Sequence, residues 1–132
     1  MRKITLNFYG YTWEDYAFQI SSLKGIFIVY KGVIDPEGFI DIKELLYVGY
    51  HNGIIELYEK NIIEAIKQYV NPSERIFLSY AEVPSEEDGI ALASLIVNGA
   101  HPKYCLNATT PASNILLICK GNCKLIPEEI IG

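Results

Sequence analysis

The chain has 132 residues, half of them hydrophobic and a fifth charged; this composition excludes a disordered chain and fits one globular domain over residues 1–132. Its net charge of -5 argues against tight sequence-independent binding to nucleic acid, because lysine and arginine side chains must neutralise the phosphates. The sequence has no membrane-length apolar run, no signal-peptide core and no CxxC pair among its three cysteines. It therefore predicts a cytoplasmic protein with free thiols and no membrane contact.

The N-terminal residues predict a short strand and then a helix. Apolar residues at positions 4, 6 and 8 alternate with other residues up to Gly10, which is typical of a strand. Thr12 is a favourable helix N-cap, and the two acidic residues that follow suit the positive end of a helix. Trp13, Tyr16 and Ile20 lie at helical spacing, so we expect a helix to begin after Thr12.

Two apolar segments, residues 25–30 and 45–50, form the centre of the sequence. Both are rich in β-branched and aromatic residues, and the linker between them is rich in turn formers, so they predict antiparallel strands joined by a long connection. Each contains a glycine, which allows another backbone or a ligand to approach closely. Phenol and imidazole groups gather near their ends, on Tyr30, Tyr47, Tyr50 and His51.

A helix and a buried strand are predicted next. Apolar residues recur at helical spacing from 54 to 70, and Asn71-Pro72 ends that helix because proline cannot continue it. The acidic and basic residues of this helix face outward, and Glu56 with Lys60 is interpreted as a surface pair one turn apart. Residues 75–83 are apolar on both faces, which favours a central strand.

A second helix and a hairpin complete the chain. Ser85 and Asp88 resemble a capping box, and the apolar helix that follows is expected to be buried on two sides and to end near Val97. Residues 115–119 and 123–126, joined by a Gly-Asn turn, predict a hairpin. In that register the cysteines at 119 and 123 point to opposite faces, which disfavours a disulfide between them.

The order of these segments resembles the GIY-YIG nuclease domain. The resemblance rests on Gly25-Ile26-Phe27, on Tyr47-Val48-Gly49, and on a helix, a strand and a second helix followed by Pro102 and Asn107; it covers roughly residues 25–107. It implies an α/β (α+β) fold with a central three-stranded sheet flanked by helices, here extended by the N-terminal strand and helix and the C-terminal hairpin. It also implies that two tyrosines, an arginine and a metal-binding glutamate surround a phosphodiester.

Several positions depart from that pattern. The arginine position falls near Leu57 or Tyr58, and the glutamate position falls on Leu92, which cannot bind a hard cation. Asp88 lies one turn away from Leu92 and is better explained as part of the helix cap. We therefore predict no metal site and no cofactor, with magnesium or manganese required only if the chain is a nuclease.

The resemblance and the residues together define a set of candidate site residues. Tyr47 is retained and His51 stands two residues after the motif glycine, so these two are candidate catalytic residues, although a hydrogen-bonded turn histidine is the preferred interpretation of His51. The candidate binding residues are Phe27, Tyr30, Gly49, Tyr50 and Asn107.

Three hypotheses for the function follow. The first is a GIY-YIG-like domain that has lost catalysis and acts as a binding or interaction module, with a protein partner, or with nucleic acid bound only weakly because of the acidic charge. The second is a divergent DNA endonuclease that uses Tyr47, His51 and Asp88. The third is a small-ligand pocket lined by Tyr30, Tyr47, Tyr50 and His51.

Overall fold

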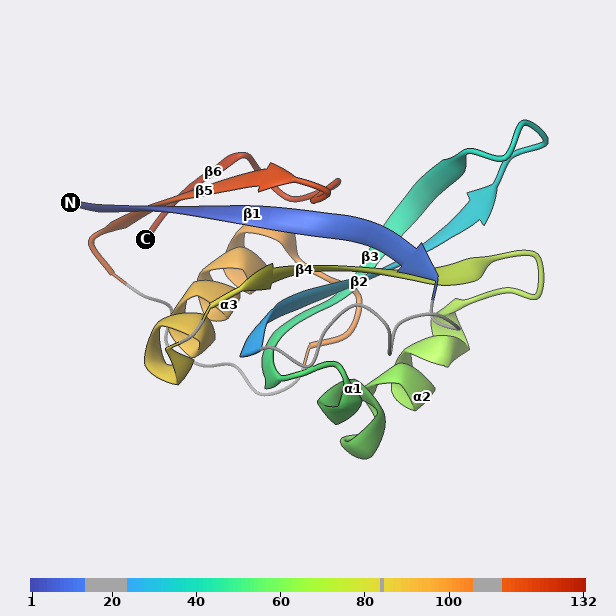
Figure 1. The fold of residues 1–132 in the computed structure, drawn as a ribbon, viewed down its shortest axis with the longest axis horizontal. Coiled ribbons are helices and arrows are strands. Elements are labelled where there is room, and N and C mark those ends of the chain that lie inside the picture. The colour runs from blue at the N-terminus through green and yellow to red at the C-terminus, as the bar shows by residue number, and fades with distance from the viewer. Residues whose placement is uncertain (14–23, 84, 106–112) are drawn as a thin grey trace.

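Six strands form one mixed, curled sheet in the computed structural model, which describes residues 1–13, 24–83, 85–105 and 113–132 (Figure 1). Within these described residues, three α-helices and a short 3₁₀ helix accompany the sheet, whose strand order is β3-β2-β4-β1-β5-β6. The predicted α+β class is confirmed, and the N-terminal and C-terminal strands join the central strands in the same sheet. The elements are β1 (Arg2–Trp13), β2 (Lys24–Ile34), β3 (Ile40–Asn52), α1 (Ile55–Glu59), α2 (Ile62–Ile66), η2 (Lys67–Tyr69), β4 (Arg75–Glu82), α3 (Glu86–Ala100), β5 (Ile115–Gly121) and β6 (Glu129–Ile131).

The predicted pairing of the two glycine-containing segments is confirmed. β2 and β3 are antiparallel, and Phe27 lies opposite Gly49. A side chain at Gly25 would collide with the carbonyl oxygen of Ala81 in β4, so a glycine is required where the two backbones meet. The predicted long connection is wrong, because both strands extend further and leave only residues 35–39 as the turn between them.

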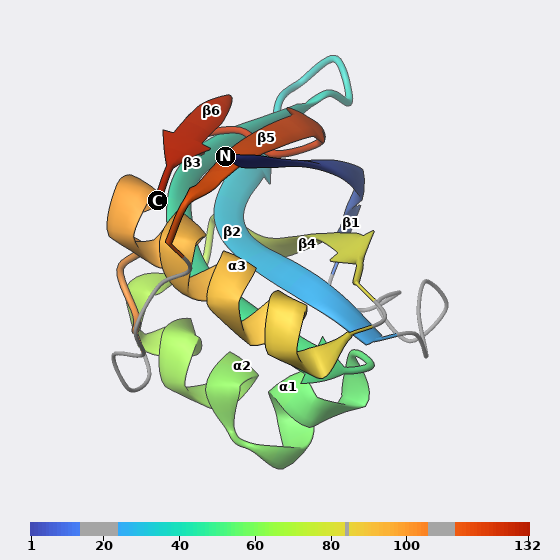
Figure 2. The same cartoon turned by 90° about the vertical axis from the view of Figure 1, so that its left-hand side faces the viewer.

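β2 separates two hydrophobic cores because its alternate side chains point to opposite faces. Ile26, Ile28 and Tyr30 belong to a cluster with the buried residues of α3, which we call the α3 core. Phe27 and Val29 belong to a second cluster with the buried residues of α1 and α2, which we call the α1–α2 core. In Figure 2, α3 lies across β2, while α1 and α2 lie below α3.

The first strand connects the two parts of the sheet. From Arg2 to Phe8 it is parallel to β5, and near its end it is antiparallel to β4. Gly10, at a φ of 77°, lies at the register shift between the two pairings, and a bend at this point lets the sheet curl around α3. The backbone of Thr12 is opposite Leu78, so the strand continues through the position where the helix was predicted to begin. Residues 14–20 of the predicted helix lie outside the described residues.

The predicted helix over 54–70 is interrupted. α1 ends at Glu59 and α2 begins at Ile62, because Asn61 adopts a left-handed conformation with φ of 59°. Ile55 is consequently exposed, while Leu57 is fully buried. None of the helices in the described part of the chain is both long and apolar enough to span a lipid bilayer.

α3 matches its prediction at the N-terminus and runs longer at the C-terminus. The Ser85 hydroxyl accepts a hydrogen bond from the Asp88 amide, as expected for a cap, and five consecutive residues from Leu92 to Ile96 are buried. The helix ends at Ala100, where His101 has a left-handed φ of 52°.

The predicted C-terminal hairpin has the wrong second strand. β5 pairs with β6, and Leu117 lies opposite Ile130, so residues 122–128 form the connection. Cys119 and Cys123 are free thiols, as predicted, but both are buried in the α3 core and do not point to opposite faces of a hairpin.

Two tyrosine hydroxyls hold the connection after β5 against the α3 core. Tyr30 donates to the Lys124 carbonyl at 2.7 Å, and the Lys124 amide donates to Tyr11 at 3.0 Å. The two rings meet edge to face at 5.6 Å. Tyr30, a candidate binding residue, thus has a structural contact inside the protein.

We expect Tyr30→Phe to lower the free energy of unfolding by about 1–3 kcal/mol, because the Lys124 carbonyl loses its partner in a part-buried position. The measurement is urea unfolding at neutral pH. Tyr9→Phe is the control, since Tyr9 is 60% exposed and its substitution should change stability by less than about 0.5 kcal/mol. Equal stability of both variants and the wild type would contradict a structural role for the Tyr30 hydroxyl.

Candidate functional site

Tyr47, His51 and Glu56 form a hydrogen-bonded chain at the end of β3. The Tyr47 hydroxyl lies 2.8 Å from Nε2 of His51, and Nδ1 of His51 lies 3.1 Å from Oε1 of Glu56. Tyr47 and His51 are four residues apart and share one face of the strand, while Glu56 comes from the first turn of α1. The strand end and the helix start therefore bring the three groups together.

The surroundings determine where the protons lie. Burial alone raises the pKa of Glu56, but the hydrogen bonds from the Asn52 amide and the His51 ring outweigh it, so this pKa is lower than usual. Burial lowers the pKa of His51, and the bond to Glu56 only partly opposes that change. An ionised Glu56 only accepts hydrogen bonds, so a neutral His51 donates from Nδ1 and its Nε2 accepts from the Tyr47 hydroxyl.

Tyr47 is not prepared to become a nucleophile. Burial raises the pKa of its hydroxyl well above the usual value, so loss of its proton is disfavoured. Tyr47 and His51 are each only 4% exposed. A substrate therefore has little access to either group in this conformation.

Gly49 and Phe27 form the apolar surroundings of this hydrogen-bonded chain. The Tyr47 ring lies over Gly49, where a side chain would collide with the ring and its hydroxyl. Phe27 is fully buried, its ring centroid is 6.4 Å from that of His51, and it stacks on Tyr80 at 5.9 Å. Both candidate binding residues thus contribute to core packing around Tyr47 and His51.

The structure does not bring all the predicted site residues together. Tyr30 and Tyr50 pack on the α3 core, on the opposite face of the sheet from Tyr47 and His51. The Tyr50 ring lies against Gly89 of α3, where it leaves no room for a side chain. These four residues therefore do not line one pocket. Asn107 lies outside the described residues.

The positions that the resemblance assigns to the arginine and the glutamate are also separated. Leu57 is fully buried in the α1–α2 core, and Leu92 is 2% exposed in the α3 core. Leu92 therefore does not lie on the same side of the sheet as Tyr47. Asp88 forms an exposed ion pair with Arg2 at 3.3 Å, which is a surface contact.

Sequence reasoning missed Glu56 as a member of this site. Its pair with Lys60 exists, at 3.7 Å, but the same oxygen also contacts the His51 ring and the Asn52 amide. The sequence did contain a signal for this contact: Glu56 lies in the first turn of a helix, and that helix directly follows a strand that ends near a histidine. The start of the helix turns back towards the end of the strand, which brings the two residues together.

The known proteins give no further indication of the function. Compared with protein-family models, curated proteins and solved structures, the chain matches none of them. Within the described residues, no group of three or more His, Cys, Asp or Glu side chains is arranged to hold a metal ion.

The neutral state of His51 makes the stability of the protein depend on pH. Its pKa is lower in the folded chain than the unfolded value of about 6.5, so the unfolded chain binds a proton first as the pH falls. The contribution of His51 is therefore complete above about pH 6.5 and is lost as the pH falls through the folded-state pKa, at about 1.4 kcal/mol per pH unit between the two values.

We expect His51→Gln to reduce stability more at about pH 7.5 than at about pH 5, because only the wild type loses this contribution on acidification. Urea unfolding of both proteins at the two pH values measures the difference. His101→Gln is the control for loss of a histidine, because His101 is exposed and its substitution should change stability by less than about 0.5 kcal/mol. A cost of His51→Gln that is equal at both values, or larger at low pH, contradicts a buried neutral histidine.

Proposed function

We propose that the chain is a GIY-YIG-like domain that has lost nuclease chemistry and acts as a binding or interaction module. The observation that supports the loss of nuclease chemistry is the burial of Leu57 and Leu92 in apolar cores. An active domain of that kind needs a guanidinium and a metal-binding carboxylate beside its tyrosines. Here both positions stabilise the fold through apolar packing.

The state of the Tyr47–His51–Glu56 chain supports the same proposal. The side chains of Tyr47, His51 and Glu56 are hydrogen-bonded to one another, and the burial of the tyrosine and histidine favours their neutral forms. Buried polar networks in which every group is bonded make a core specific and rigid. The three residues therefore connect β3 to α1.

The charge of the chain bears on the choice of partner. A net charge of -5 disfavours a partner that is recognised through its phosphates, so a protein partner fits better than nucleic acid. No divalent metal is required for such a role.

A divergent endonuclease remains the second candidate, favoured by one observation. Nε2 of His51 is positioned to accept the Tyr47 proton, and Glu56 holds the ring in the orientation for that transfer, as in other base-activated nucleophiles. This candidate requires a second conformation in which Tyr47 is exposed to a phosphodiester.

We expect the protein to leave branched, single-stranded and double-stranded DNA intact at low salt with magnesium or manganese, because a neutral, buried phenol does not attack phosphate. End-labelled substrates resolved on denaturing gels give the measurement. The matched variants are Tyr47→Phe and His51→Ala. Metal-dependent cleavage by the wild type would overturn the binding-module proposal. Its loss in either variant would assign the reaction to these residues, and its persistence in both would exclude them from it.

A further inference from the structure

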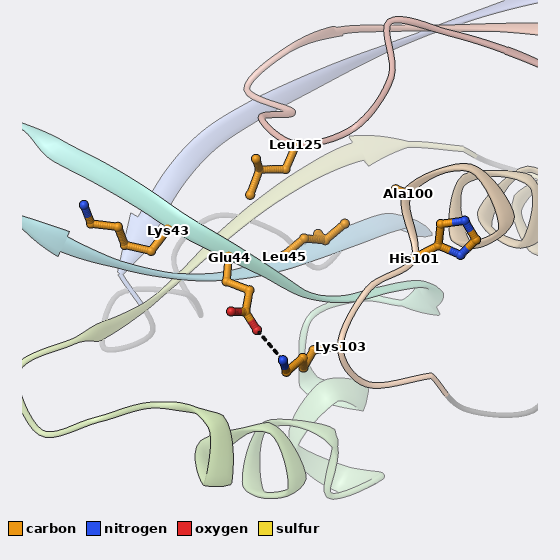
Figure 3. A pocket seen from close by; sticks show the side chains of 7 residues that line it. All are labelled: Lys43, Glu44, Leu45, Ala100, His101, Lys103 and Leu125. Carbon is orange, nitrogen blue, oxygen red and sulfur yellow. Dashed lines mark ion pairs between the residues drawn. The ribbon is translucent and has the colours of Figure 1, made fainter.

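A pocket of about 400 Å³ lies away from Tyr47, between β3, the C-terminal end of α3 and the connection after β5 (Figure 3). This volume lies within the range typical of small-molecule sites. Side chains of both charges and of apolar character line it, and those used below are Glu44, Lys103, Leu45, Ala100 and Leu125.

The charged groups that line this pocket are Glu44 and two lysines, Lys43 and Lys103. The Lys103 ammonium lies 3.5 Å from Oε1 of Glu44, which is an ion pair too long for a good hydrogen bond. The atom Oε1 of Glu44 is buried and accepts no hydrogen bond, and the Lys31 ammonium lies 3.9 Å from Oε2 of the same carboxylate. A buried carboxylate oxygen that has an ion pair but no hydrogen bond can still accept one, so a ligand donor that reaches Oε1 of Glu44 would stabilise the site.

The end of α3 adds to the negative side of the pocket. Ala100, the last residue of this 15-residue helix, lines the pocket, and helix C-termini carry a partial negative charge that favours a cation. On the other side, the Lys43 ammonium is already paired with Asp41 at 2.6 Å, and in Figure 3 it points away from Glu44. Lys103 is thus the cation most directly available to a ligand anion.

The apolar part of the pocket is held in an unusual conformation. Leu125 has a φ of 66°, which a leucine rarely adopts, and it is nevertheless 53% exposed. The Tyr11 and Tyr30 hydroxyls hold the preceding residue, Lys124, from both sides of its backbone. Strained residues kept in place by their surroundings are frequent at binding sites.

We propose that this pocket binds the zwitterion of a small apolar amino acid. The ammonium group would bond to Glu44 near the α3 C-terminus, the carboxylate would pair with Lys103, and the apolar side chain would contact Leu45 and Leu125. The ligand then places a second pair of charges beside the Glu44–Lys103 ion pair, with its positive group next to Glu44 and its negative group next to Lys103. A ligand with only one charge compensates one side of the pair and leaves the other unchanged. This proposal is independent of the GIY-YIG resemblance.

The test is a titration of the isotope-labelled full chain by heteronuclear NMR with four probes. Leucine carries all three features, 4-methylpentanoate lacks the amine, 3-methylbutylamine lacks the carboxylate, and glycine lacks the side chain. We expect saturable shifts at residues 43–45, 100–103 and 124–126 with leucine, and affinities at least about tenfold weaker with each other probe, because each loses one charged or apolar contact. Absence of saturable shifts with leucine, or equal affinity for any single-charge probe, overturns the proposal.

Variants identify the residues that hold the ligand. Glu44→Gln and Lys103→Gln should each weaken leucine binding about tenfold or more, and the controls Glu59→Gln and Lys120→Gln, at exposed positions outside the pocket, should leave it within about twofold. Leu125→Gly should weaken binding without lowering the melting temperature, because glycine adopts the positive φ readily. Unchanged leucine affinity in Leu125→Gly, or equal losses in the controls, contradicts the assignment.

Discussion

The antiparallel placement of β2 between β3 and β4 is the constraint on which the rest of the structure depends. Its residues 26–30 are completely buried, so both faces of the strand must be covered. α3 covers one face, and α1 with α2 covers the other. Because side chains alternate along the strand, a shift of one residue in register would exchange the two sets of side chains, and neither core would fit.

This arrangement explains why the polar groups of β3 have separate roles. Tyr47 and His51 share the α1–α2 face and reach each other and Glu56, whereas Tyr50, between them in sequence, packs against Gly89 on the α3 face. On the α1–α2 face, the side chains of Tyr47, His51 and Glu56 are hydrogen-bonded to one another, and burial favours the neutral forms of the tyrosine and histidine. The tyrosine and histidine side chains that lie close together in the sequence are thus placed on two different faces of the sheet.

The sequence predicted those features that depend on neighbouring residues. The pairing of β2 with β3, the central position of β4 and the Ser85 cap follow from local apolar patterns and capping chemistry. The features it missed depend on distant partners. Thr12 has good capping chemistry but pairs with Leu78 in the sheet, and the left-handed conformation of Asn61 interrupts a regular helical pattern although both short helices pack into the α1–α2 core. Glu56 was assigned to the surface because its contact with His51 requires the turn between β3 and α1.

The contrast between the two polar sites bears on function. In the Tyr47–His51–Glu56 chain, every hydrogen bond is completed within the protein, which is what stability alone requires. At the pocket between β3 and α3, Oε1 of Glu44 has no hydrogen bond, and Leu125 occupies a backbone conformation that costs free energy without burying its side chain. The ion pairs of Glu44 with Lys31 and Lys103 and the two tyrosine hydroxyls at Lys124 hold these groups in place, but they leave the buried oxygen and the leucine side chain open to a ligand. The proposed ligand, whose carboxylate pairs with Lys103, whose ammonium donates to Glu44 and whose side chain covers Leu125, would use both features. We therefore propose that ligand binding be tested at this pocket before it is tested at Tyr47.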